Sequence, residues 1–363
     1  DRMVADPTLA YAAQADMLNK RLAALKEAEL TRTDRFEART DVPPILEVKD
    51  LCIKFPRHGD VNVVDHVSFV VRPRQTMGLV GESGCGKSIT SLAIMGLLDK
   101  KAEISGEIMY DGKNLLNLSD KEMNELRGRE IAMVYQDALS SLNPSMLIRA
   151  QMKQLTKRGG TRSAEELLEL VGLDPKRTLE SYPHELSGGM RQRVMIAIAL
   201  ACEPKLLIAD EPTTALDVTI QAQILELMND LRHKLGMSII MITHDLGVVA
   251  QMCEKIAVMY AGHIVEYGTT DEIFYNPQHE YTKGLINSIP KLNAEEKERL
   301  VPIEGQPVDL LNPPAGCPFA PRCKSCMKVC LNKMPPKTEL SDTHYTYCWL
   351  RQKEEFEKGG KAE

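Results

Sequence analysis

The sequence predicts an α/β protein built around parallel strands, and three observations support this. Two largely apolar runs, Lys205–Ala209 and Ser238–Thr243, have the composition of strands that a parallel sheet buries on both faces. Between them one helical face is formed by Ile220, Ile224, Leu227, Leu231 and Leu235. Gly236 follows at the position where a helix commonly ends. The order strand, helix, strand is the repeating unit of a layered α/β domain.

Shorter β-rich runs precede this region. We expect strands at Ile45–Val48, Val67–Val71, Thr76–Val80 and Glu107–Tyr110. The turn pair Asp111-Gly112 closes the last of them. After residue 290 the pattern loosens into a proline-rich stretch, which predicts a domain boundary near residue 300.

Composition and charge argue against several classes of protein. The chain has 363 residues, of which 43% are apolar and 26% charged, close to ordinary globular usage. The formal charge of −6 provides no broad basic field for nucleic acid. Its longest apolar run, Val194–Cys202, is far shorter than the ~20 residues of a membrane-spanning helix. We therefore expect a soluble protein, and without a secretory leader a reducing compartment.

Residues 1–43 predict a helical extension. Asp6 can cap the helix, Pro7 suits its first turn and Pro43-Pro44 stop it. One narrow apolar stripe is formed by Tyr11, Ala15, Leu18, Leu22 and Leu25. Such a helix lies on its own domain or a neighbour, or docks another subunit.

A phosphate-binding loop follows the strand Thr76–Val80. Gly81-Glu82-Ser83-Gly84-Cys85-Gly86-Lys87-Ser88 has the required pattern and opens a helix through Leu92 and Ile94. Its glycines let backbone N–H groups converge on phosphate oxygens. Lys87 supplies a cation at the outer phosphates, and the Ser88 hydroxyl can ligate Mg²⁺.

Polar residues follow the two buried runs. Asp210 and Glu211 follow the first, and His244 follows the second. A parallel sheet binds ligands outside the carboxyl ends of its strands. We expect Asp210 to hold Mg²⁺ through water and Glu211 to orient or deprotonate the attacking water. His244 is expected to contact the γ-phosphate.

The segment Leu186–Gln192 resembles the signature sequence of ABC-type ATPases and precedes Asp210-Glu211 as that family requires. Further elements of the family match in order. Phe55 resembles the aromatic residue that stacks on adenine, and Gln136 resembles the glutamine of the Q-loop. Ala215-Leu216-Asp217 resembles the D-loop, and His244 resembles the switch histidine. The resemblance implies a P-loop ATPase domain over residues 44–300, with an antiparallel β subdomain and a helical subdomain.

The resemblance also implies roles for individual residues. ATP contacts are implied for Phe55, Gly81, Glu82, Ser83, Gly84, Cys85, Gly86, Lys87, Ser88, Ile89 and Gln136. Mg²⁺ is implied to bind through Ser88, Gln136 and Asp210, and catalysis to involve Glu211 and His244. In a head-to-tail dimer, contacts to the partner's ATP are implied for Ser187, Gly188, Gly189 and Gln192, with Asp217 in the D-loop.

Three other segments resemble the ATPases of oligopeptide/dipeptide and nickel importers, namely Gln136–Pro144, Tyr182–Glu185 and Tyr275–Thr282. This implies an ATPase subunit peripheral to the cytoplasmic side of the cell membrane. Its partners would be two permease subunits, a second and unlike ATPase subunit and, indirectly, an extracellular substrate-binding protein. Peptides are the expected cargo, with nickel or another solute as the alternative. A nucleic-acid-associated ABC ATPase is disfavoured, because neither a basic face nor a long coiled-coil insertion is visible.

Five of the nine cysteines lie in the last part of the chain. Cys317, Cys323, Cys330 and Cys348 match the cysteines of the family's C-terminal domain, which in some members holds a 4Fe-4S cluster. Cys323 and Cys326 also have a zinc-ligand spacing, so structural zinc and free thiols stay open as alternatives. We expect a cysteine-rich domain at residues 301–350 and a charged tail at 351–363. The scattered Cys52, Cys202 and Cys253 are expected only to pack.

Overall fold

The computed structural model describes residues 20, 23, 42–137, 141–289 and 302–359. The helix predicted over residues 1–43 lies outside these ranges except at isolated positions, and it stays a prediction. The chain divides into two compact units. In the described residues, the first unit comprises 20, 23, 42–43, 72–76, 117–137 and 141–242, and the second comprises 44–71, 77–116, 243–289 and 302–359.

Parallel strands form the core of the first unit. They are β6 (Ile131–Val134), β7 (Leu206–Asp210) and β8 (Ser238–Thr243), with β7 paired to both others. Every residue of the three strands is buried, as their apolar sequences predict. The predicted strand–helix–strand order around β7 and β8 is confirmed.

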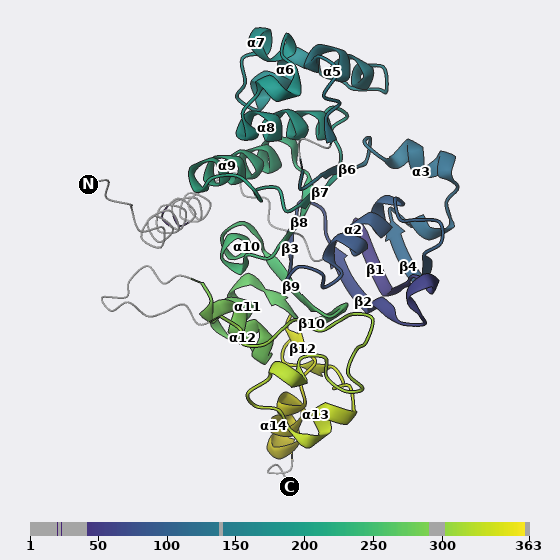
Figure 1. Ribbon diagram of the computed structural model, residues 1–363, viewed down its shortest axis with the longest axis vertical. Helices are drawn as coiled ribbons and strands as arrows, with labels where there is room; N and C mark the ends of the chain where they lie inside the picture. Colours follow the sequence, from purple (N-terminus) through teal and green to yellow (C-terminus); the bar gives the residue numbers. More distant parts are fainter. Residues whose placement is uncertain (1–19, 21–22, 24–41, 138–140, 290–301, 360–363) are drawn as a thin grey trace, which may run out of the picture. The chain divides into compact units, whose positions relative to one another are not determined.

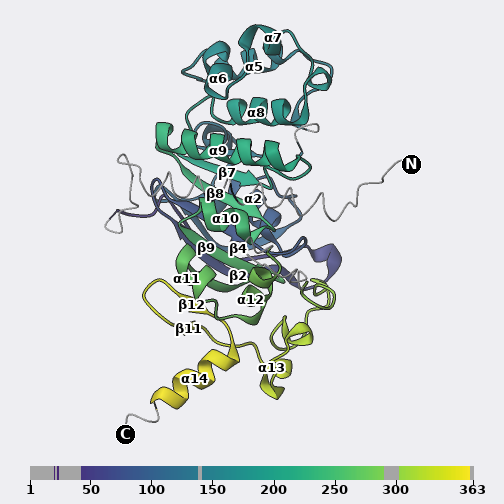
Figure 2. The ribbon, with the colours of Figure 1, turned by 90° about the vertical axis from the view of Figure 1, so that its left-hand side faces the viewer.

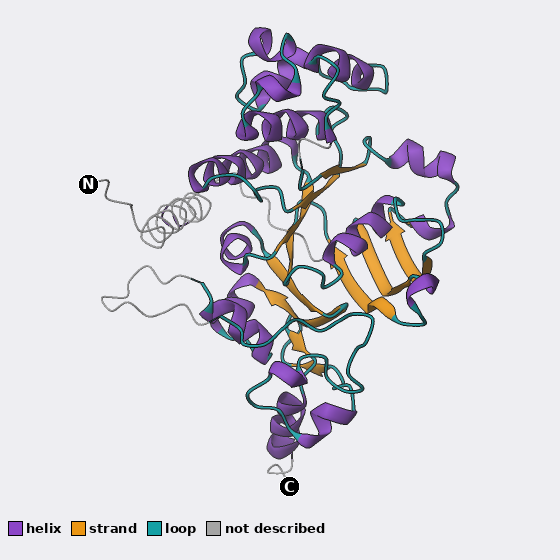
Figure 3. Cartoon of the chain, viewed as in Figure 1, coloured by secondary structure: helices purple, strands orange, loops and turns teal. Residues whose placement is uncertain are grey.

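Helix α9 (Val218–Leu235) connects β7 to β8. At the start of this helix, the Asp217 carboxylate accepts the Ile220 N–H at 3.0 Å. At its end, Gly236 adopts φ +66° and terminates the helix. Helix α8 (Gly188–Ala199) lies beside α9 (Figure 1). Within the described part of the unit, the other α-helices are α3 (Asp120–Leu126), α5 (Ile148–Thr156), α6 (Ala164–Leu170) and α7 (Pro175–Leu179). The segment from α5 to α8 holds helices and no strands in its described residues (Figure 3).

The second unit contains an antiparallel sheet with strand order β2-β1-β4-β5. Its strands are β1 (Leu46–Lys54), β2 (Asn62–Val71), β4 (Glu103–Tyr110) and β5 (Lys113–Asn114). Leu46 lies opposite both Val71 and Tyr110. The strands predicted here were placed correctly but were too short, because irregular pairing interrupts the alternation of apolar and polar residues on which the prediction relied.

A second group of strands in this unit starts with β3 (Thr76–Val80), which pairs in parallel with β9 (Lys255–Tyr260). β10 (His263–Thr269) pairs with β9, and β12 (Tyr345–Thr346) joins β10 to β11 (Thr338–Glu339). The helices are α2 (Lys87–Met95), α10 (Leu246–Met252), α11 (Thr270–Tyr275), α12 (Glu280–Asn287), α13 (Lys328–Asn332) and α14 (Trp349–Gly359). Thus the cysteine-bearing tail hydrogen-bonds to the edge of β10, while α14 runs on towards the C-terminus (Figure 2).

No helix within the described ranges combines the length and the apolar composition that crossing a membrane requires.

Candidate functional site

The phosphate-binding loop joins β3 to α2, as predicted. Gly84 and Gly86 have φ values of +79° and +99°, which side chains rarely adopt. A Cβ atom on Gly81 would lie 2.3 Å from the carbonyl oxygen of Met259, so only glycine fits there. The loop is therefore closely seated on the strand beside it, with a backbone cradle at the start of α2.

Lys87 is the first residue of α2 and is only 5% exposed. Its ammonium group bends back and donates a hydrogen bond to the Gly81 carbonyl oxygen. This places a cation at a helix N-terminus, where the helix dipole also favours an anion. Burial raises the pKa of the neighbouring Cys85 thiol, which keeps this thiol protonated and uncharged.

The second residue of the loop, Glu82, is held by the C-terminal part of the chain. Arg322 donates two hydrogen bonds to its carboxylate, at 2.8 and 3.1 Å, and the Arg322 side chain is only 3% exposed. The Tyr281 hydroxyl oxygen accepts the Glu82 backbone N–H at 2.9 Å. Hydrogen bonding to Glu82 raises the pKa of Arg322. Sequence reasoning did not find this pair, because 240 residues separate its members.

The residues expected around Mg²⁺ and water in the first unit lie at one edge of its sheet. Asp210 is the last residue of β7, and Glu211 follows it; they are 7% and 9% exposed. The Glu211 backbone N–H donates to the Ile242 carbonyl oxygen at 2.8 Å. The Glu211 carboxylate accepts a hydrogen bond from the Thr214 hydroxyl at 2.9 Å. Gln136 is exposed and follows the parallel strand β6, so its backbone leaves the sheet at the same edge.

The expected signature residues form the start of α8. The Ser187 hydroxyl caps this helix by accepting the Met190 N–H at 3.3 Å. Gly188 is partly exposed, whereas Gly189 is packed so tightly that a Cβ atom would lie 2.7 Å from Cγ2 of Ile220. Gln192 is 3% exposed. Asp217, at the start of α9, is exposed.

The other expected nucleotide residues belong to the second unit. His244 is exposed and directly follows β8. The carbonyl oxygen of the preceding residue, Thr243, accepts the Gly81 N–H of the phosphate loop at 3.4 Å. Phe55 is partly exposed at the end of β1. Each unit thus groups its own share of the predicted nucleotide residues.

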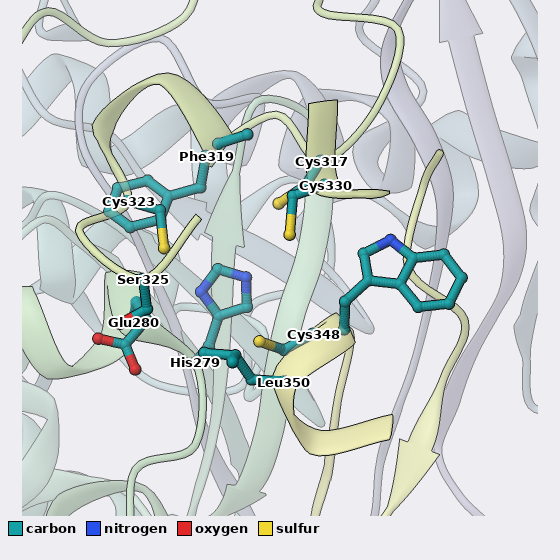
Figure 4. Close-up of a pocket in the computed structure, with 11 residues that line it drawn as sticks. His279, Glu280, Cys317, Phe319, Cys323, Ser325, Cys330, Cys348 and Leu350 are labelled. Carbon is teal, nitrogen blue, oxygen red and sulfur yellow. The ribbon is translucent and has the colours of Figure 1, made fainter. Parts of the chain in front are cut away.

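Four cysteines of the tail line one pocket. They are Cys317, Cys323, Cys330 and Cys348, and their sulfur atoms are shown in Figure 4. His279, Phe319, Ala320, Trp349 and Leu350 also line the pocket. Cys326, the fifth cysteine of the tail, is exposed and lies outside this lining. The backbone N–H of Met327 donates to the Cys330 sulfur at 3.4 Å.

Burial favours the neutral form of three of these thiols, those of Cys317, Cys323 and Cys348. Burial raises the pKa of Cys317 and of Cys323 to about 11, and it also raises that of Cys348. A thiolate ligand therefore needs a metal centre to stabilise its charge. Around one zinc ion, two thiolates lie about 3.8 Å apart. Among the described residues, no three tail thiols lie within 4.8 Å of one another, so their spacing is wider than a single ion requires.

Two family profiles match the chain. The ABC transporter profile matches residues 64–214, and the profile of the oligopeptide/dipeptide transporter C-terminal region matches residues 265–330. Among solved structures, CbiO1 from Clostridium perfringens, part of the ABC transporter complex CbiONQ, is 27% identical with a TM-score of 0.56, over 65% of this chain and 92% of that one. The cassette MJ0796, as a dimer bound to ADP and Pi, is 27% identical with a TM-score of 0.54, over 62% and 98%.

The fold and the phosphate loop thus define an ABC-type ATPase, which binds ATP and uses Mg²⁺. Curated relatives show which family of ABC-type ATPases the chain belongs to. The oligopeptide transport ATP-binding protein OppD of Bacillus subtilis is 52% identical over 85% of this chain and 89% of its own length. The dipeptide transport ATP-binding protein DppD of that organism is 50% identical over 85% and 95%. The chain belongs to this family of oligopeptide and dipeptide transport ATP-binding proteins.

Proposed function

We propose that this chain hydrolyses ATP to power the uptake of oligopeptides or dipeptides through separate permease subunits. The observation that supports this most strongly is the 52% and 50% identity to two ATP-binding proteins of peptide transport along most of the chain. In this proposal the chain sits at the cytoplasmic side of the membrane and pairs with a second, unlike ATPase subunit. An extracellular binding protein delivers the substrate.

Roles at the nucleotide follow from the residue chemistry. The phosphate loop and Lys87 would hold the phosphates, and Phe55 would stack on adenine. Ser88, Gln136 and Asp210 would hold Mg²⁺, which neutralises phosphate charge. Glu211 would orient or deprotonate water, with His244 at the γ-phosphate. The remaining ATP contacts are assigned to Glu82, Ser83, Cys85, Ile89 and the loop glycines.

Hydrolysis in this proposal requires two ATPase subunits arranged head to tail. Ser187, Gly188, Gly189 and Gln192 would contact the ATP bound by the partner, and Asp217 would lie at the same interface. Support comes from the dimeric state of the related cassette MJ0796 bound to ADP and Pi. Bound ATP would then hold the two subunits together, and hydrolysis would release them.

Uptake into proteoliposomes tests the substrate. The chain is reconstituted with two permease subunits and a second ATPase subunit from the same organism, and uptake of a radiolabelled peptide is measured with ATP inside and a binding protein outside. Glu211→Gln serves as the matched inactive control. Uptake of peptide by the wild type and not by the variant supports the proposal. ATP-dependent uptake of a nickel chelate, with no uptake of peptide, would show that the cargo is nickel and not peptide.

We further propose that residues 301–350 act as a cluster-holding domain and that Cys317, Cys323, Cys330 and Cys348 bind a 4Fe-4S cluster. The pocket fits such a group, because the four thiols line one space, and four converging thiolates can complete the coordination of a cluster. The bound cluster would cross-link the loops that carry the four thiols. The hydrogen bond from Met327 to the Cys330 sulfur would stabilise a thiolate there.

Anaerobic purification tests this second proposal. The wild type and Cys326→Ser should both be brown, with four iron and four sulfide per chain, because Cys326 lies outside the pocket. Cys348→Ser should lose most of the iron. A colourless wild type that carries stoichiometric zinc would refute the cluster.

A further inference from the structure

A separate group of metal-ligand side chains lies on the β1–β2 hairpin, in the second unit. Cys52, Asp65 and His66 each offer a ligand atom, and these three atoms lie within 4.8 Å of one another. The Cys52 sulfur is 3.9 Å from Asp65 Oδ1, and His66 Nε2 is 3.6 Å from the same oxygen. Ligand atoms around tetrahedral zinc lie about 3.3–3.8 Å apart, so small side-chain movements would complete such a shell.

An irregularity in the sheet creates this group. Ile53 pairs with Val64 and Leu51 pairs with Val67, which leaves Cys52 alone opposite both Asp65 and His66. Neighbouring residues of a regular strand point to opposite faces. Here His66 has φ +48°, in the left-handed region, and both side chains approach the same thiol.

Surrounding groups orient each ligand. The backbone N–H of His66 donates to the Cys52 sulfur at 3.3 Å, a contact that stabilises a thiolate. Asn62 donates to Asp65 Oδ1 at 3.3 Å, and the Asp50 carboxylate lies 4.0 Å from His66 Nδ1, the ring nitrogen that faces away from the group. Metal-bound histidines commonly have a carboxylate at this position.

His263, at the start of β10, approaches from the neighbouring hairpin. Its Nε2 lies 3.6 Å from Asp65 Oδ2, the carboxylate oxygen not shared with His66. The Asp65 backbone N–H donates to the Gly262 carbonyl oxygen at 2.9 Å, which holds the two hairpins together.

We propose that Cys52, Asp65 and His66 form a binding site for a zinc-like divalent cation, with His263 as a fourth ligand or as the group that orients Asp65. One thiolate, one or two imidazoles and one carboxylate are the ligand types of Zn²⁺, Co²⁺ or Ni²⁺ rather than of Mg²⁺ or Ca²⁺. The ion would join the β1–β2 hairpin to the turn before β10. The Gly262 backbone N–H in that turn donates to the Cys85 carbonyl oxygen of the phosphate loop at 2.9 Å.

Zinc and cobalt titrations of the reduced, chelator-treated full chain test the site. Each titration is compared among the wild type, Cys52→Ser, His66→Gly and the control Cys202→Ser, all of which retain the tail thiols. The wild type and the control should bind one more equivalent of Zn²⁺ than the two site variants. The Co²⁺ spectrum of the wild type minus that of Cys52→Ser should contain a thiolate charge-transfer band, whereas the wild type minus Cys202→Ser should contain none. His263→Gln should weaken the affinity by about 10–100-fold.

His66→Gly also separates metal binding from folding. Glycine suits φ +48°, so the metal-free variant should melt at the wild-type temperature or above it. Zinc should raise the melting temperature of the wild type more than that of this variant. Equal stoichiometry, and equal zinc-induced shifts, in all four proteins would overturn the proposal and leave the group as polar contacts between Asp65 and two histidines.

Discussion

Replacing Arg322 by methionine should destabilise the second unit and loosen the phosphate loop. The change removes both hydrogen bonds to Glu82, at 2.8 and 3.1 Å, but keeps an apolar side chain of similar length. Breaking a fully buried ion pair by removing one partner costs ~3–5 kcal/mol. Because the Glu82 side chain is 27% exposed and regains some hydration, we expect about 2–3 kcal/mol. At about 2–4 °C per kcal/mol, the melting temperature should fall by about 4–12 °C.

Thermal melting and nucleotide titration on the full chain measure the two effects. Lys324→Met is the matched control, since Lys324 pairs with Glu304 at the surface, where both side chains are about three-quarters exposed. The control should melt as the wild type does. Arg322→Met should also bind ATP more weakly, because Glu82 would no longer be held in the loop.

A double-mutant cycle with Glu82→Gln isolates the pair. The loss of stability in the double variant should be smaller than the sum of the two single losses. Additive losses, or an Arg322→Met protein with the melting temperature of the control, would refute the coupling. Lower stability with unchanged ATP affinity would show that the pair supports the tail and not the loop.

Three further predictions concern single residues. Glu211→Gln should bind ATP normally and lose at least about 100-fold in turnover in the assembled transporter, and unchanged turnover would remove Glu211 from catalysis. Gly189→Ala should destabilise the first unit by about 1–3 kcal/mol in denaturant unfolding, because its Cβ would lie 2.7 Å from Ile220 Cγ2; Ile220→Ala should restore much of the loss. Burial, aided by the charges of nearby Arg351 and Lys283, lowers the pKa of His279 to about 3. Between about pH 3 and pH 6.5, His279 is therefore protonated in the unfolded chain but not in the folded one. Stability should therefore fall from pH 7 to pH 5, and His279→Gln should reduce that fall; an equal fall in both proteins would contradict it.

Local sequence signals were sufficient for the strands and helices that bury a continuous apolar surface. Both β3 and β8 have the predicted bounds, and α9 ends at Gly236 as expected. β6 and β9 were not predicted, because short buried strands have no periodicity that separates them from other apolar runs. Pairing irregularities likewise hid the full extent of β1 and β2.

For the site, the sequence predicted residue types in order, but long-range contacts depend on the fold. The phosphate loop was evident from its pattern, whereas its link to Arg322 was not, since no local signal joins residues so far apart. Likewise, Cys52 was expected only to pack. Its position opposite two residues of β2 became visible only once the register of the hairpin was known.

The exposure of Cys326 makes it a natural reporter of the state of the tail. All the other cysteines are buried or only partly exposed, so a bulky maleimide should label the intact protein at this position first. Damage that opens the four-thiol pocket would add further labelled positions, which mass spectrometry of the whole chain can count. The thiol that the proposed cluster does not use therefore allows occupancy to be followed without any engineered probe.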